Sequence, residues 1–426
     1  MRPLLVLSTL TVLAASACAS AGPAAAVPPV TPTNTTATNT TASNTTTTTQ
    51  RDASAANDFN VSMYGALRRE QGNLFFSAPS MRQALGVAYL GARGDTAKEM
   101  SSAIHLDPDL QKSAAFARGE NADFQSAKGE ATLDVANRLW VQKGLELHKT
   151  FLRLGNEAYG APVDQVDFLR QPGDARKTIN TWVEKQTHDK IKDLLPEPAI
   201  TPDTRLVITN AVFFKGSWAQ QFDKGATRDE AFLVDGNKST DVPMMHHQGS
   251  YGYAEGDGAQ VLEMKYEKSD LAMDVILPTS AAGLRDVEDK VLAGKMGTWT
   301  SALSNRTVNV TFPKLTVKWG RSVKEELKAL GMKQAFESDA DFTGIAPART
   351  AGGNLSVSDV IHKAFIAIDE EGTEAAAATA VIVGREATVS VPVVTKFKAD
   401  HPFLFVIRDT KHDRVLFMGR VTNPKG

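Results

Sequence analysis

The chain has 426 residues, of which 42% are hydrophobic and 23% are charged, so it is long and apolar enough to bury a large core. Its 47 Lys and Arg stand against 49 Asp and Glu, and this near-balance excludes both a basic nucleic-acid-binding surface and an acidic solvating tail. The single cysteine excludes a disulfide within the chain and any site that needs several thiolates.

The first residues have the pattern of an export signal. Arg2 gives a positive start, and an apolar run from Leu4 to Ala17 leads to a small-residue stretch. The run is shorter than the roughly 20 residues that span a bilayer. Cys18 follows at a position that resembles the lipid-modified cysteine of bacterial lipoproteins, although Ala15 stands where that motif usually has leucine. Two alternatives remain open, namely lipidation of Cys18 in the cell envelope or plain cleavage and secretion.

A low-complexity segment separates this signal from the rest of the chain. Residues 18–52 are rich in Thr, Asn, Pro and Ala and lack apolar periodicity. Such a composition cannot bury enough surface to offset the entropy of ordering, so we expect an extended tether. The predicted organisation is a signal peptide over 1–17, the tether over 18–52 and one folded domain over 53–426.

Helices dominate the first part of the folded domain. Phe59, Met63 and Leu67 recur at a spacing of four and predict an opening helix. A second helix is predicted between Ser80 and Gly91, with Ser80 as its cap. Two further starts are predicted by capping-box spacing, at Thr96 with Glu99 and at Ser322 with Glu325.

Strands dominate the later part. The run Leu206–Phe214 is almost continuously apolar, which is typical of a strand covered on both faces. Two stretches, "LAMDVILP" and "VNVTFPKLTV", alternate with a period of two, and "HPFLFVI" and "RVLFMG" form a predicted hairpin. Because helices and strands are segregated along the chain, the fold class is predicted to be α+β.

Motifs for catalysis and metal binding are missing from the sequence. It contains no G-x-S-x-G, H-E-x-x-H, Walker A or C-x-x-C pattern, so we expect neither an enzyme nor a cofactor. His246 and His247 are adjacent, and on a strand their side chains would point to opposite faces, which disfavours a shared metal ion. An acidic cluster at Glu370, Glu371 and Glu374 is better interpreted as a solvated loop face than as a catalytic group.

The local signals conflict between Glu370 and Pro392. The first half, with its glutamates and four alanines, favours a helix, whereas the second half, with its valines, favours a strand. Sequences tend to break local consistency at functional or strained sites. We therefore expect this stretch to carry the function.

With these residues in view, the chain resembles the serpin family of protease inhibitors from about Ala53 to Pro424. The resemblance rests on segments that occur in the family's order: "NLFFSAPS", "GARGDTAKEM", "ITNAVFFKGSW", "VPMM", "FPKLTV", "LKALGM", "IHKAFIAIDEEGTEAAAATA" and "HPFLFVIRD…VLFMGRVTNP". One departure is Ala78, which separates Ser77 from Pro79 where the family usually has proline directly after the serine. The resemblance implies three β-sheets, about eight or nine helices and an exposed reactive centre loop.

The resemblance also assigns residues to roles. The shutter, a polar cluster behind the central strands, would comprise Ser77, Ser80, Asn210 and His362, and the breach, where the loop begins, would comprise Trp218, Lys314 and Glu370. The conflicting stretch becomes the reactive loop, which is exposed as bait and inserts into the main sheet after cleavage. Its hinge would comprise Glu370, Glu371, Gly372, Thr373, Glu374, Ala375, Ala376, Ala377, Ala378 and Thr379, which are small enough to pass between parting strands.

The reactive bond follows from the family's usual spacing of sixteen residues after the first hinge glutamate. That count places cleavage at Glu386–Ala387, and a loop shorter by one would place it at Arg385–Glu386. The implied function is inhibition of a serine protease, or of a cysteine protease, by a suicide-substrate mechanism in a monomeric protein. The alternative is a non-inhibitory serpin that acts as a binding or carrier protein, and no nucleic acid or metal is implied as a partner.

Overall fold

The computed structural model describes residues 56–160, 162–235, 238–347, 354–373 and 394–426. The chain divides into two compact units, 1–45 and 46–426, and all the described residues belong to the second. The predicted signal and tether, Cys18, the hinge from Glu374 to Thr379 and both candidate reactive bonds (Arg385, Glu386, Ala387) lie outside the described residues. Within the described part, no helix is long and apolar enough to cross a membrane.

The helices lie mostly in the first part of the domain, as predicted. The opening helix covers 56–67 and buries Phe59, Met63 and Leu67 completely. The others are α2 (Ala78–Gly91), α3 (Gly94–Ala103), α4 (Leu110–Ala127), α5 (Lys149–Tyr159), α6 (Pro172–Gln186), α7 (Leu284–Leu292), α8 (Met296–Ser301) and α9 (Lys324–Ala329), with 3-10 turns at Lys224–Ala226 and Gln334–Phe336.

The start of α2 differs from the prediction in its cap. Ser77 is the N-cap, and its hydroxyl oxygen accepts a hydrogen bond of 3.3 Å from the backbone N–H of Ser80. Ser80 lies inside the first turn. Pro79 is one of the first two residues of α2, where a backbone N–H would have no partner within the helix, so its absence does not destabilise the helix. The departure from the family pattern at Ala78 therefore leaves the helix start intact.

Near the second predicted capping box, α9 begins at Lys324 with Val323 as its N-cap, and the Ser322 hydroxyl accepts the backbone N–H of Lys324 at 3.3 Å. The first predicted box, at Thr96 and Glu99, is wrong. Helix α3 begins at Gly94, and the hydroxyl of Thr96 instead accepts the backbone N–H of Asp341 at 2.9 Å. The Glu99 carboxylate accepts the backbone N–H groups of Lys333 and Gln334 at 2.8 and 2.6 Å. Both side chains serve a distant segment because they are buried or half-buried against it.

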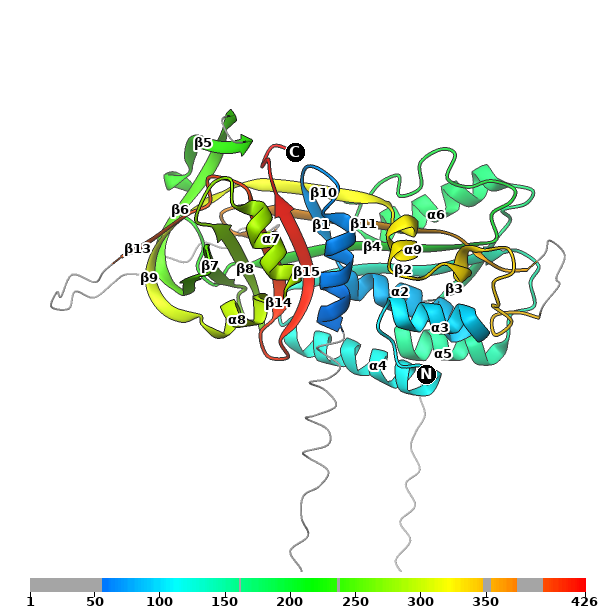
Figure 1. Cartoon of the computed structure of the whole chain (residues 1–426). Coiled ribbons are helices and arrows are strands. Elements are labelled where there is room, and N and C mark those ends of the chain that lie inside the picture. The colour runs from blue at the N-terminus through cyan, green and yellow to red at the C-terminus, as the bar shows by residue number, and fades with distance from the viewer. Residues whose placement is uncertain (1–55, 161, 236–237, 348–353, 374–393) are drawn as a thin grey trace, which may run out of the picture. The chain divides into compact units, whose positions relative to one another are not determined.

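One sheet has six strands in the order β10-β11-β12-β4-β2-β3 (Figure 1). Their bounds are β2 (Thr132–Gln142), β3 (Val163–Val166), β4 (Leu206–Ser217), β10 (Leu315–Ser322), β11 (Val357–Ile368) and β12 (Gly372–Thr373). The apolar run predicted as a doubly covered strand is β4, whose first nine residues are all buried. Alternate residues of β4 join two different cores, with Val212 in one and Val207 and Phe213 in the other.

The second sheet has nine strands, in the order β1-β15-β14-β8-β7-β6-β9-β13, with β5 paired to β6. Their bounds are β1 (Leu74–Phe76), β5 (Arg228–Asp235), β6 (Lys238–Gly256), β7 (Ala259–Lys265), β8 (Leu271–Pro278), β9 (Ser304–Pro313), β13 (Thr395–Lys398), β14 (Phe403–Asp409) and β15 (Arg414–Val421). The long strand β6 pairs with β5 at one end and with β7 at the other, so it joins two groups of strands. The predicted C-terminal hairpin is the antiparallel pair β14–β15.

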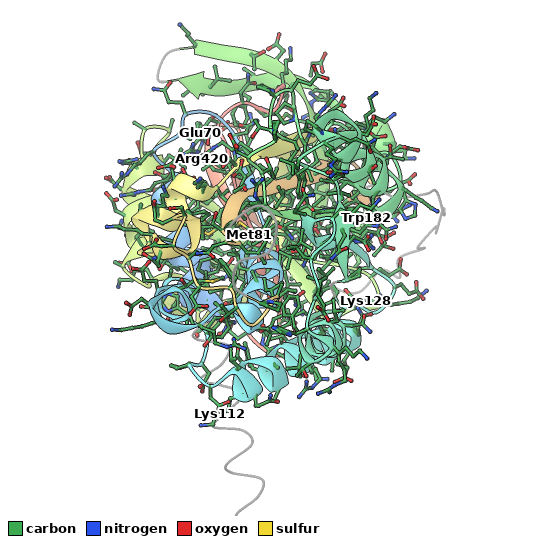
Figure 2. The ribbon with its side chains drawn as sticks, turned by 90° about the vertical axis from the view of Figure 1, so that its right-hand side faces the viewer. Glu70, Met81, Lys112, Lys128, Trp182 and Arg420 are labelled. Carbon is green, nitrogen blue, oxygen red and sulfur yellow. The ribbon has the colours of Figure 1, made fainter. Side chains whose placement is uncertain are left out.

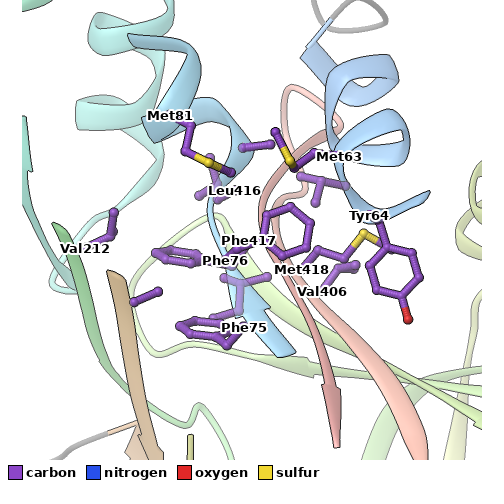
Figure 3. Close-up of a cluster of buried hydrophobic side chains, with 14 of the residues drawn as sticks. Met63, Tyr64, Phe75, Phe76, Met81, Val212, Val406, Leu416, Phe417 and Met418 are labelled. Atoms are coloured by element: carbon purple, nitrogen blue, oxygen red, sulfur yellow. The ribbon is translucent and has the colours of Figure 1, made fainter. Parts of the chain in front are cut away.

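Aromatic side chains join the sheets into one core. The ring of Phe75 stacks on Phe417 with centroids 5.0 Å apart, and Phe417 contacts Phe214 of β4 at 5.8 Å. Figure 3 shows this cluster, with Met81 of α2 lying over it. Helix α2 thus packs between the two sheets, and the predicted α+β class is confirmed.

Helix α6 covers the other face of the six-stranded sheet. Its Trp182, labelled in Figure 2, meets Trp140 of β2 edge-on with ring centroids 5.6 Å apart. The guanidinium of Arg138 lies 4.1 Å from the centroid of the Trp182 ring, a cation–π arrangement. Both faces of the sheet are therefore packed, and its centre lies beneath α6 on one side and above α2 on the other.

Candidate functional site in the six-stranded sheet

The centre of the six-stranded sheet contains a strand of only two residues. Gly372 and Thr373 form β12, which pairs antiparallel with Ser217 and Gly216 of β4 and, through Thr373, with Ile368 of β11. Further along, β11 and β4 pair directly with each other in parallel, up to Phe365 opposite Phe213. The chain therefore enters between two strands at one end and the strands close beyond it.

The register of the two flanking strands is the same on both sides of this entry. Ile368 and Gly216, which flank Thr373, differ by 152 in residue number. His362 and Asn210, which pair directly, also differ by 152. A third strand could thus extend between β11 and β4 from Thr373 to the shutter residues without any sliding of one along the other.

The side chain of Thr373 is fully buried and its hydroxyl has one partner. Thr373 Oγ1 lies 2.9 Å from the hydroxyl of Tyr266. Burial raises the pKa of Tyr266 well above that of an ordinary phenol, so the hydroxyl keeps its proton. The Tyr266 ring stacks on Trp218 with centroids 4.7 Å apart. This contact holds the start of the predicted loop inside the sheet.

Glycine is required at position 372 by the close approach of β4. A Cβ added there would lie 2.2 Å from the carbonyl oxygen of Gly216 and 2.7 Å from the Cα of Ser217. Both are backbone atoms, which cannot turn aside as a flexible side chain could. Gly372 therefore allows β12 to lie against β4.

The three predicted breach residues come together where β11 ends. Lys314 Nζ lies 2.8 Å from Glu370 Oε2, and Thr227 donates to the other carboxylate oxygen at 2.8 Å. Burial raises the pKa of Glu370, and the bonds from Lys314 and Thr227 lower it by more, so the carboxyl group stays ionised. The indole N–H of Trp218 donates to the carbonyl of Asp369 at 3.1 Å.

The turn that leads from β11 into β12 is held by its own backbone and by a second ion pair. Asp369 accepts the N–H groups of Glu371 and Gly372 at 3.0 and 3.2 Å, and Lys224 pairs with Glu371. The backbone carbonyls of Glu370 and Glu371 accept N–H groups of the chain that follows β4. Both glutamates thus position the turn. The expected solvated loop face is wrong for Glu370, which is buried, and for Glu371, which is half-buried, and Glu374 lies outside the described residues.

The four predicted shutter residues also come together. Asn210 Nδ2 donates to Ser80 Oγ at 2.6 Å, and Ser77 N–H donates to His362 Nε2 at 3.3 Å. The other ring nitrogen of His362 bonds the side-chain oxygen of Asn210. All four residues are at most 5% exposed, so this is a fully enclosed polar cluster between α2, β4 and β11.

The protonation state of His362 follows from these contacts. Nε2 accepts a hydrogen bond from a backbone N–H, so the ring proton lies on Nδ1. Burial lowers the pKa of His362 to about 3, because a charged ring would lose its hydration there. The neutral ring bridges β11 to β4 and α2.

Asn137 of β2 is a fifth member that the sequence did not indicate. Its side-chain oxygen bonds Asn210 and lies 3.5 Å from Ser80 Oγ, and its Nδ2 donates to the carbonyl of Ser80 at 3.2 Å. In "VANRLWV" the alternate positions Val135, Leu139 and Val141 are apolar, and a polar residue among them is the signal that could have found Asn137. The cluster therefore links three elements of the sheet and helix α2.

The two adjacent histidines have different hydrogen-bond partners. His246 Nδ1 lies 3.2 Å from the Thr311 hydroxyl and its Nε2 lies 2.9 Å from a Glu230 oxygen, whereas His247 bonds the Tyr251 hydroxyl at 2.7 Å. Among the residues that the structure describes, no group of three His, Cys, Asp or Glu could hold a metal ion. What the site can do is accept a strand between β11 and β4.

Comparison with known proteins agrees with this architecture. A family model described as Serpin (serine protease inhibitor) matches residues 54–424. The chain is 40% identical over 373 residues to an uncharacterized serpin-like protein of Thermococcus kodakarensis, a match that covers 87% of this chain and 85% of that protein. It is 38% identical over 382 residues to the leukocyte elastase inhibitor of Bos taurus, covering 87% and 99% of the two chains.

The chain is also similar in structure to a protein that binds a small molecule. Human thyroxine-binding globulin, crystallised with thyroxine, superposes with a TM-score of 0.79 at 27% sequence identity. The match covers 89% of this chain and all of that one. The same architecture thus occurs in an elastase inhibitor relative and in a protein complexed with a small molecule.

Proposed function

Because the chain belongs to the serpin family, we propose that it inhibits serine-type endopeptidases as a suicide substrate rather than acting as an enzyme. A protease would cleave the reactive bond in the loop that follows β12 and remain attached to the new carboxyl end as an acyl-enzyme. The cleaved loop would then extend β12 between β11 and β4 and carry the protease with it. The observation that supports this most directly is the entry of Thr373 between two strands whose register already fits a strand between them.

The energy for such a movement comes from backbone hydrogen bonds. The strands must part by one strand spacing, about 4.8 Å, to admit a new one. Some twelve residues that each gain about 1 kcal/mol net would release on the order of 10 kcal/mol before any packing. Ala375, Ala377 and Thr379 alternate with the buried Thr373 in sequence, and their small side chains suit entry on the same face.

The proposed reactive bond is Glu386–Ala387, with Arg385–Glu386 as the second choice. A glutamate before the bond favours glutamate-preferring proteases, whereas an arginine favours trypsin-like ones. Mass spectrometry of the released C-terminal fragment decides between them. A fragment that begins with Ala387 supports the first bond, and one that begins with Glu386 supports the second.

The inhibitory function is tested by covalent trapping. The protein is incubated with trypsin-, elastase-, subtilisin- and glutamyl-type proteases and analysed on a denaturing gel. We expect at least one protease to form an adduct that survives denaturation, at the combined mass of the protease and the cleaved inhibitor. Cleavage without any adduct across the panel would contradict the proposal.

The alternative is a non-inhibitory carrier, which the similarity to thyroxine-binding globulin keeps in view. A carrier has no need of a loop that can insert, so bulky or charged residues at the inward hinge positions would favour it. Thr373 is instead small and uncharged, and its hydroxyl is hydrogen-bonded at its buried position. The hinge therefore favours the inhibitor.

A further inference from the structure

A group of lysines lies around the ring of Phe365, on the face of the six-stranded sheet that α6 covers. Phe365 shares a core with Ile179 of α6, so its ring points to this face. Lys318 of β10 is directly opposite Phe365, and its ammonium nitrogen lies 5.6 Å from the ring centroid. The ammonium nitrogen of Lys190, which follows α6, lies 5.9 Å from the same centroid. Lys363 is two residues before Phe365 on β11 and therefore shares its face.

Lys215 of β4 extends this group across the junction between β4 and β11. Phe213 of β4 pairs with Phe365, and the two rings are 5.9 Å apart. Lys215 is two residues beyond Phe213 and therefore shares its face. It also precedes Gly216, which pairs with Thr373 at the entry of β12. The group therefore spans both strands that flank the entry. We call it the lysine patch, which consists of Lys190, Lys215, Lys318 and Lys363.

The lysine patch has little counter-charge of its own. Within the described part of the chain, the ammonium groups of Lys215 and Lys318 form neither an ion pair nor a hydrogen bond. Lys363 Nζ donates to the backbone carbonyl of Lys192 at 2.7 Å. Burial lowers the pKa of Lys363, Asp193 raises it, and the neighbouring Lys318 lowers it again. An anion bound here would therefore be attracted by several lysines that now repel one another.

A carboxylate on β2 lies beyond one edge of the lysine patch. Asp134 pairs with Phe213 on the side of β4 that faces away from β11. His188 Nε2 lies 3.2 Å from Asp134 Oδ2, so this carboxylate already has a partner. An anion on the lysine patch would avoid Asp134 by lying over β4, β11 and β10.

The residue types and their spacing determine which anion fits. All four cations are lysines, whose compact ammonium groups bind phosphate as point charges and offer no planar guanidinium fork for a carboxylate. Lys318 is exposed, so its attraction for a single small anion would be screened by water and salt. Lys215 and Lys318 lie on strands that flank β11, and two strand spacings amount to about 10 Å. An anion with several linked charged groups can contact both lysines, whereas a single phosphate cannot.

We propose that the lysine patch binds an anion with several linked phosphate groups, of which a short polyphosphate chain is the simplest. One end of this ligand contacts Lys318 and Lys363 on β10 and β11, and the other end contacts Lys215 on β4. Lys190 contacts the middle of the ligand from its position over the Phe365 ring.

Such a ligand opposes parting of the sheet, a consequence that rests on the proposed function. Insertion would separate β4 from β11 by one further strand spacing, about 4.8 Å. Lys215 would then move away from Lys318 and Lys363, and a short polyphosphate would no longer contact both sides equally well. The anion therefore binds the closed sheet more tightly, and by linkage it disfavours the inserted state by the same factor.

Binding is measured by isothermal titration calorimetry of the intact protein with inorganic tripolyphosphate, and with orthophosphate at the same ionic strength as the comparison. The Lys215→Gln/Lys318→Gln variant removes two charges from the lysine patch. Its matched control is Lys238→Gln/Lys411→Gln, which removes two charges from exposed sites on β6 and in the β14–β15 turn. We expect the wild type and the control to bind tripolyphosphate saturably, at least about tenfold more tightly than orthophosphate and at least about tenfold more tightly than the patch variant does.

The results that would overturn the proposal are distinct. Absence of saturable binding, equal affinity of the patch variant and the wild type, or equal weakening in both variants overturns the site. Equal affinity for tripolyphosphate and orthophosphate overturns the class of ligand. The single variant Lys215→Gln tests whether the ligand reaches β4, and we expect its affinity to fall about threefold. Unchanged affinity in Lys215→Gln overturns the contact across the junction, and the coupling with it.

The coupling is tested by cleaving the loop that follows β12, removing the protease and titrating the cleaved protein with tripolyphosphate. We expect the affinity to fall about threefold relative to the intact protein, together with a rise in the unfolding temperature that reports insertion. Equal affinity in the two forms, with that rise, overturns the coupling alone. Absence of the rise contradicts the proposed function and the coupling that rests on it, whereas the site is decided by the titrations of the intact protein.

Discussion

The Thr373 side chain occupies a space that fits a hydroxyl and a methyl group. It is fully buried, with the Tyr266 hydroxyl as its hydrogen-bond partner. Among the described residues, Thr373 contacts the Tyr266 hydroxyl and the backbones of β4 and β11, and none of these groups carries a charge. A charged side chain at position 373 would therefore have to leave the sheet to stay hydrated.

We expect Thr373→Arg to convert the protein from an inhibitor into a substrate. A buried unpaired charge costs several kcal/mol, so insertion slows while cleavage of the exposed loop continues. The acyl-enzyme then hydrolyses before it is trapped. The measurement is the molar ratio of inhibitor to protease needed for full inhibition, which should rise at least about tenfold. Thr373→Ser, which keeps the hydroxyl, is the control, and wild-type trapping by the arginine variant would refute loop insertion.

His362 gives the protein a specific dependence on pH. Burial lowers its pKa in the folded state to about 3, whereas in the unfolded chain it is near 6.5. Below pH 6.5 the unfolded state therefore binds a proton at His362 and the folded state does not. The free energy of unfolding consequently decreases as the pH falls toward 3. From pH 6.5 to 5 this amounts to about 2 kcal/mol.

The measurement is the free energy of unfolding by urea at pH 7 and pH 5 for the wild type and for His362→Gln. Glutamine does not titrate, so the loss between the two pH values should be smaller in the variant by about 2 kcal/mol. All other titrating groups are common to both proteins and cancel in the comparison. Equal losses would show that His362 is not the group responsible.

At the scale of elements, the two-residue strand β12 depends on Gly372. A methyl group there would meet the β4 backbone at 2.2 Å, so Gly372→Ala should push β12 out of the sheet. We expect faster hydrogen exchange of the peptide that covers 369–373 and slower trapping of proteases. Gly173→Ala on α6, where an added Cβ meets nothing within 4 Å, is the matched control. Unchanged exchange in Gly372→Ala would contradict the role assigned to the glycine.

An element could be predicted from the sequence where the order of its apolar residues shows which of its faces are buried. The strand β4 follows from its continuous apolar run, because each face packs against a different core. The capping box predicted at Thr96 and Glu99 failed for the opposite reason. Thr96 and Glu99 have the right spacing, but they form hydrogen bonds with segments more than 200 residues away in the chain. A local sequence pattern does not indicate such a distant partner.

In the candidate site, too, some residues could be predicted from the sequence and others only from the structure. Ser77, Ser80, Asn210 and His362 were found through family resemblance and not through any periodicity, because isolated polar residues in apolar strands carry little local information. Asn137 was missed although it bonds two of them. The pairing of Thr373 with β4 and β11 depends on contacts between segments far apart in the chain, so only the structure gives it.

At the scale of the whole chain, we propose that the protein is exported and attached to the cell envelope through Cys18. The apolar run before this cysteine is short for a membrane span, so a lipid would be the anchor. We expect the wild type to partition into the detergent phase of a cloud-point extraction and Cys18→Ser to move to the aqueous phase. Equal partitioning of both proteins would favour simple secretion.

The constant register of β11 and β4 has a mechanical consequence. Because the two strands keep one offset from Thr373 to the shutter, each residue that the proposed insertion drew between them would gain its bonds in the same geometry as the last. A gain of about 1 kcal/mol for each 3.4 Å of travel corresponds to a pull of about 20 pN. The sheet would then pull on an attached protease with nearly constant force throughout insertion. A protease whose fold resists a force of that size would escape without being distorted.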